Sequence, residues 1–75
     1  MENITALTFR FAWPDGTETS VTVRLNKAGL VNAVTPTGDS AKLPDLALYR
    51  ATNTVRAEAH LFASVHACKL TVEEK

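Results

Sequence analysis

The chain has 75 residues, with eight basic and eight acidic side chains and therefore a formal net charge of zero. This length predicts one small domain with a thin core. The balanced charge argues against a dedicated nucleic-acid binder and against a polybasic membrane anchor, whereas weak self-repulsion favours association with another protein or a second copy of the chain.

The cellular compartment is predicted from three features that the sequence lacks: a second cysteine, a secretory signal and a membrane-spanning apolar run. Cys68 is the single cysteine, so no disulfide can form within the chain. The N-terminal residues have neither the basic nor the apolar region of a secretory signal, and no apolar run reaches the ~20 residues that cross a bilayer. Together these features predict a protein of the reducing cytoplasm.

The first predicted element is a β-hairpin. Apolar residues alternate with polar ones over residues 4–13 and 18–25, and Pro14-Asp15-Gly16 between them is a turn sequence. A three-residue loop at 14–16 sets Trp13 opposite Thr17 and brings both apolar rows to one face, whereas a two-residue loop opposes Trp13 to Glu18. The predicted apolar face consists of Leu7, Phe9, Phe11, Val21, Val23 and Leu25.

A third strand is predicted over residues 30–35, after a turn at Asn26-Lys27-Ala28-Gly29. A three-residue loop would direct Val31 and Ala33 to the core, and a four-residue loop would direct Leu30 and Val34 there together with Asn32. We favour the first arrangement, because a buried Asn needs hydrogen-bond partners.

Residues 35–44 have the composition of a loop, and residues 45–53 predict a short helix. Asp39 or Ser40 is suited to cap it, Pro44 to its first turn and Asp45 to its positive end. Its predicted inward stripe is Ala47, Leu48 and Ala51.

Residues 55–72 fit two templates. Apolar residues occupy every odd position from 55 to 67, which favours a strand, yet Leu61, Phe62, Val65, Cys68 and Val72 also form a helical stripe. We favour the strand. The predicted fold is therefore α+β: a three-stranded antiparallel meander, a short helix and a long C-terminal strand. The alternative is the same meander packed under one long C-terminal helix.

The order of elements from Val21 to Val55, with a Gly-Asp loop before a short helix, is similar to that of TonB-type C-terminal domains. The aromatic and proline signature expected after the helix in that family is replaced here by Thr54-Val55-Arg56-Ala57. The resemblance is limited to this pattern and implies no function.

Candidate binding residues lie on the hairpin and its following turn. Phe9, Phe11 and Trp13 could form a base-stacking platform, but a core row fits better because the partner strand adds valines to the same face. The opposite face is polar, and there guanidinium groups could bind carboxylate or phosphate. The candidate binding residues are Arg10, Arg24, Trp13 and Lys27.

Catalytic and metal chemistry are disfavoured by the sequence. His60, His66 and Cys68 share a face if residues 55–68 form a strand, but a zinc site needs three or four ligands and no second cysteine exists. Cys68 with His66 lacks an orienting acid and an oxyanion loop. We therefore expect no enzyme, no metal and no cofactor, but a small protein–protein interaction module: an accessory subunit or inhibitor encoded by a bacterium, its phage or a mobile element, whose partner is another protein or a second copy. One alternative is a nucleic-acid-associated sheet protein that uses Arg10, Arg24, Lys27 and Trp13. The other is a small metal-dependent or thiol enzyme centred on His66 and Cys68.

Overall fold

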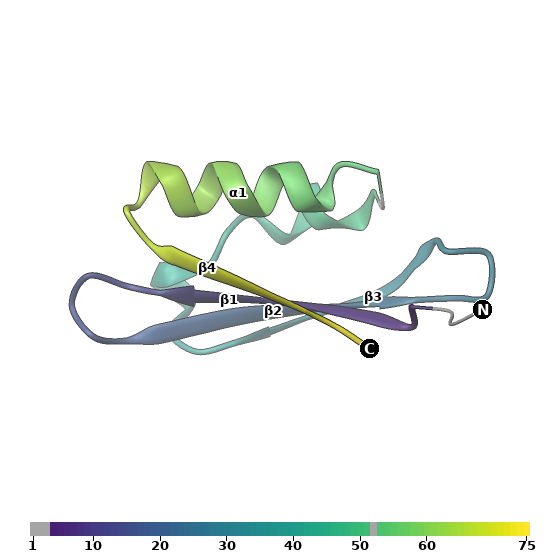
Figure 1. Cartoon of the computed structure of the whole chain (residues 1–75), viewed down its shortest axis with the longest axis horizontal. Helices are drawn as coiled ribbons and strands as arrows, with labels where there is room; N and C mark the ends of the chain where they lie inside the picture. The colour runs from purple at the N-terminus through teal and green to yellow at the C-terminus, as the bar shows by residue number, and fades with distance from the viewer. Residues whose placement is uncertain (1–3, 52) are drawn as a thin grey trace.

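The computed structural model describes residues 4–51 and 53–75, which form a four-stranded antiparallel sheet with a helical layer on one face (Figure 1). The strands are β1 (Ala6–Ala12), β2 (Glu18–Leu25), β3 (Val31–Thr37) and β4 (Lys69–Glu74), in the order β3-β2-β1-β4. Two 3-10 helices, η1 (Ser40–Lys42) and η2 (Leu46–Arg50), and one α-helix, α1 (Val55–Val65), connect β3 to β4. The α+β class, the meander and a C-terminal strand are confirmed.

The β1–β2 hairpin has the predicted register. Phe9 lies opposite Val21, Leu7 opposite Val23, and the Trp13 amide donates to the Thr17 carbonyl at 2.9 Å. Gly16 closes the three-residue loop with a φ of +88°, a backbone conformation that glycine adopts without strain. All of the predicted apolar face is buried except Leu25, which is partly buried against the same core.

Strand β3 follows neither of the two predicted facings. Leu25 pairs with Val31 but Arg24 pairs with Ala33, so Asn32 is an extra residue in a β-bulge. The bulge shifts the alternation by one residue and lets both Val31 and Val34 pack on the core while Asn32 stays exposed.

The short helix predicted over residues 45–53 is wrong in type and in its inward face. Asp39 and Asp45 each accept a backbone hydrogen bond two residues on and cap two separate 3-10 turns. Ala47, Leu48 and Ala51 are exposed, and Tyr49 is buried instead. A five-residue 3-10 segment directs few side chains inward, and the large tyrosine ring gains most from burial.

The long strand predicted within residues 55–72 is also wrong: residues 55–65 form α1, residues 66–68 turn the chain, and only residues 69–74 are a strand. Four of the seven odd positions from 55 to 67 are alanines, which produced the apparent alternation, yet alanine is the strongest helix former. Val55, Ala59 and Ala63, at helical spacing, turn toward the sheet. The short helix of the architecture is therefore α1, not residues 45–53.

A Schellman motif ends α1 and turns the chain into β4. The Cys68 amide donates to the Ala63 carbonyl at 2.8 Å and the Ala67 amide to the Ser64 carbonyl at 3.3 Å. Ala67 takes the left-handed position, with a φ of +56°, that glycine usually fills.

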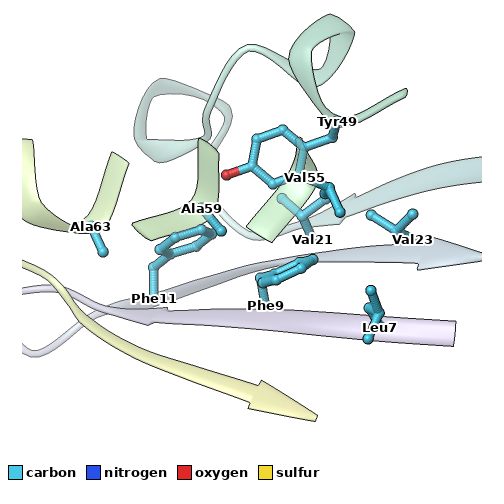
Figure 2. Packing of buried hydrophobic residues seen from close by; sticks show 9 residues of the cluster. All are labelled: Leu7, Phe9, Phe11, Val21, Val23, Tyr49, Val55, Ala59 and Ala63. Carbon is cyan, nitrogen blue, oxygen red and sulfur yellow. The ribbon is translucent and has the colours of Figure 1, made fainter. Parts of the chain in front are cut away.

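The core lies between the sheet and the helical layer (Figure 2). Phe9 meets the Tyr49 ring edge-on, with ring centroids 6.0 Å apart, and Phe11 meets Phe62 at 5.0 Å. The alanines of α1 bring its backbone close to these rings. Nine buried side chains form the core cluster: Leu7, Phe9, Phe11, Val21, Val23, Tyr49, Val55, Ala59 and Ala63.

Candidate interaction surfaces

An apolar groove of about 200 Å³ lies between η2 and α1, on the helical layer. Five of its lining residues carry apolar or aromatic side chains on these two helices: Leu48, Tyr49, Leu61, Phe62 and Val65. Pro44, Asp45, Glu58 and His66 complete the lining.

Exposed apolar side chains gather at this groove. Of the five exposed large aliphatic residues in the described part of the chain, three line it: Leu48 at 49%, Leu61 at 59% and Val65 at 70% exposure. Such a patch with a polar rim is typical of a binding surface. The rim is acidic, because Asp45 and Glu58 contribute carboxylates and neither forms an ion pair within residues 4–51 and 53–75.

The Tyr49 hydroxyl is a buried polar group at this groove. Tyr49 is 1% exposed, and its hydroxyl has no hydrogen-bond partner among the described residues. Burial, and secondarily the negative charge of Glu58, raises the pKa of the Tyr49 phenol. The hydroxyl therefore stays protonated at neutral pH and costs stability where it lies.

Trp13 packs against two of the residues that line one end of the groove. Its ring contacts Phe62 and His66, with centroids 5.9 and 5.3 Å away. Its indole Nε1 donates to the Thr19 hydroxyl at 2.8 Å, and that hydroxyl donates to the Lys42 carbonyl at 2.9 Å. Trp13 is therefore a half-buried packing residue, as its position in the apolar row indicates.

Arg10 and Arg24 lie on the opposite, uncovered face of the sheet. The Arg10 Nε donates to Glu73 at 2.7 Å, and Arg10 also lies 3.5 Å from Glu18. The hydrogen bond from Arg10 to Glu73 raises the pKa of the guanidinium, and the two carboxylates neutralise its charge. Arg24 pairs in register with Ala6, four residues along β1 from Arg10, so the two arginines form no shared anion site.

Lys27 lies exposed in the turn between β2 and β3, away from both faces. The four residues singled out by sequence thus occupy three separate surfaces: Arg10 and Arg24 the open face, Trp13 the helical side and Lys27 a turn.

His60, His66 and Cys68 do not share a strand face, because His60 lies on α1 and His66 at its end. The described residues contain no group of three or more potential metal ligands. Burial raises the pKa of the Cys68 thiol, and the Asp15 charge adds to this, which disfavours the nucleophilic thiolate.

Sequence reasoning missed the groove because it treated residues 55–68 as a strand. On a helix, Leu61 and Val65 stand one turn apart, away from the inward row of Val55, Ala59 and Ala63. A helix with a second apolar stripe outside its core stripe is the signal that would have found this surface.

No helix in residues 4–51 and 53–75 is long and apolar enough to cross a membrane. Comparisons with protein families, with curated proteins and with solved structures each found no match to this chain.

Proposed function

We propose that this chain is a small non-catalytic protein–protein interaction module, acting as an accessory subunit or inhibitor. The observation that carries the proposal is the gathering of Leu48, Leu61 and Val65 around one groove. Because these side chains are already about 30–50% covered, a partner that buried each one fully would gain roughly 0.7–2 kcal/mol per side chain.

The groove fits an apolar segment of a partner protein that also carries a cation. Leucine-sized side chains would fill the space between η2 and α1, and a lysine or arginine beside them would meet the carboxylates of Asp45 and Glu58. Apolar anchors supply affinity, and the charge pair supplies orientation.

The test compares two leucines of equal exposure. Leu61 is 59% exposed within the groove, and Leu30 is 60% exposed outside it. Tagged wild-type, Leu61→Glu and Leu30→Glu proteins are used to capture partners from cells that make the protein, and the affinity of each variant for the captured protein is then measured.

Leu61→Glu should weaken binding about 30-fold or more, as loss of an anchor residue of ~2 kcal/mol does, while Leu30→Glu leaves it unchanged. Both variants should unfold within ~0.5 kcal/mol of the wild type, because both sites are on the surface. Equal binding by the two variants would remove the groove from the interaction.

A further inference from the structure

The sheet has two edges, and only one of them is open to another strand. Edge strand β3 carries Pro36, which has no amide proton, contains the bulge at Asn32, and has η2 packed against it. The other edge strand, β4, has no proline, no bulge in its pairing with β1, and no strand on its outer side among the described residues. In Figure 1, β4 passes in front of the other strands, as the strand order β3-β2-β1-β4 requires of an edge strand.

The hydrogen bonds to β1 identify the backbone groups of β4 that point outward. The Lys75 amide donates to the Ala6 carbonyl at 2.9 Å, and the Ala6 amide donates to the Lys75 carbonyl at 3.1 Å. Because antiparallel pairing alternates, Lys69, Thr71 and Glu73 also direct their backbone groups to β1. Leu70, Val72 and Glu74 therefore present theirs outward.

A second copy of β4 can pair with this edge about a two-fold axis normal to the sheet. Such an axis keeps each face continuous, so odd residues meet odd residues and even residues meet even ones. The registers that pair at least five of residues 69–75 with the second copy are centred on Thr71, Val72 or Glu73.

Charge selects one of the three. Centring on Glu73 sets two glutamates opposite each other, and centring on Val72 sets Lys69 opposite Lys75 of the second copy. Centring on Thr71 instead sets Lys69 opposite Glu73 of the second copy, twice by symmetry. Opposite charges directly across strands stabilise pairing, and like charges oppose it.

The Thr71-centred register also pairs apolar side chains with each other on the helical side of the sheet. Leu70 and Val72 are only half-buried on the helical side, and this register sets each opposite the other across the two-fold axis. Glu73 already accepts a hydrogen bond from Arg10, so it would lie between two cations, with Arg10 on one side and Lys69 of the second copy on the other.

We propose that two copies of this chain join through β4 in antiparallel register centred on Thr71, forming a continuous eight-stranded sheet held by two Lys69–Glu73 ion pairs. The partner that pairs with the β4 edge is thus a second copy of the chain, and the η2–α1 groove takes no part in this dimer. The proposal is independent of the proposed function.

The test is a charge swap followed by sedimentation equilibrium over a concentration series at low salt. Lys69→Glu and Glu73→Lys alone should each weaken the dimer about 30-fold, because two cross-strand pairs turn repulsive at once. An equimolar mixture of the two variants should form heterodimers, since both pairs are then complementary. Lys69→Glu/Glu73→Lys should restore the homodimer.

Lys75→Glu is the register control. It leaves the Thr71-centred dimer unchanged, whereas it would tighten a Val72-centred one by removing the contact between Lys69 and Lys75. Circular dichroism verifies that each variant folds. Should Glu73→Lys unfold through loss of its Arg10 contact, the wild-type dimer must still weaken as salt rises, because its ion pairs are exposed.

A wild-type protein that stays monomeric up to its solubility limit would overturn the proposal. Dimers of unchanged affinity in both single variants, or no heterodimer on mixing two folded variants, would do the same.

Discussion

The end of helix α1 yields a prediction whose sign depends on the backbone. Ala67 has a φ of +56° and is the one non-glycine residue with positive φ in the described chain. An L-residue with a side chain pays roughly 1–2 kcal/mol for this conformation, and glycine pays nothing.

Ala67→Gly should therefore stabilise the protein. Glycine loses roughly 0.5–1 kcal/mol more backbone entropy than alanine on folding, so the net gain is about 0.5–1 kcal/mol. For a domain of this size, that raises the melting temperature by roughly 5 °C. Urea and thermal unfolding followed by circular dichroism measure both quantities.

Ala57→Gly is the matched control, because Ala57 is exposed in the first turn of α1. The same substitution there should destabilise the protein by roughly 0.5–1 kcal/mol, since glycine is a poor helix former. Opposite signs at the two positions support the Schellman motif. Destabilisation at both would refute it, and would be expected if residues 55–68 formed one long strand.

Three further predictions concern the core and its supports. Thr19→Val removes the buried hydroxyl that joins the Trp13 indole to the Lys42 carbonyl of η1, and it should lower the free energy of unfolding in urea by roughly 1–3 kcal/mol. Thr35→Val, on the exposed open face of β3, should change it by less than ~0.5 kcal/mol, and equal costs for the two variants would show that the Thr19 hydroxyl contributes nothing. Tyr49→Phe should be neutral or stabilising at neutral pH, because the lost hydroxyl has no partner among the described residues. It should also reduce the loss of stability that the wild type shows as pH rises above about 10, the unfolded pKa of tyrosine, toward the raised folded pKa of Tyr49. An unchanged alkaline profile would argue against burial of this hydroxyl. Gly38→Ala should destabilise the protein more than Gly16→Ala. Both glycines have positive φ, but a Cβ on Gly38 would lie 2.9 Å from the Thr19 side chain, whereas a Cβ on Gly16 would meet open space. Similar melting temperatures for the two variants would contradict this packing.

The hairpin could be predicted in full from the sequence, because local rules determine it. Alternation identified the buried face, and the requirement that both apolar rows share that face set the three-residue loop, so the pairing of Phe9 with Val21 followed. The choice between a core row and a stacking platform also followed, since the valines of β2 complete a dry face.

The second half of the chain depends on tertiary contacts that no local pattern shows. Alanine fits both a strand and a helix, so the alternation over residues 55–67 was ambiguous until the sheet provided rings for Ala59 and Ala63 to pack on. The end of α1 could not be predicted from the sequence, because the usual signal for such a cap is glycine and this position holds Ala67. The bulge at Asn32 likewise resolves two facings that a regular strand cannot satisfy together.

The errors in the second half of the chain also limited what could be predicted about the candidate binding surfaces. Arg10 was correctly placed on the open face, but its neutralisation by Glu73 requires β4 to lie beside β1, a pairing of residues 63 positions apart. The groove requires both η2 and α1, and the sequence assigned neither correctly.

The most direct measurement of the proposed function is site-specific photo-crosslinking in cells that make the protein. A photoreactive phenylalanine analogue replaces Leu61 in one protein and Leu30, of equal exposure, in another. Crosslinking of one discrete partner protein from position 61, with none from position 30, is the predicted result. The same products from both positions, or no product from position 61, would contradict the groove as the binding surface.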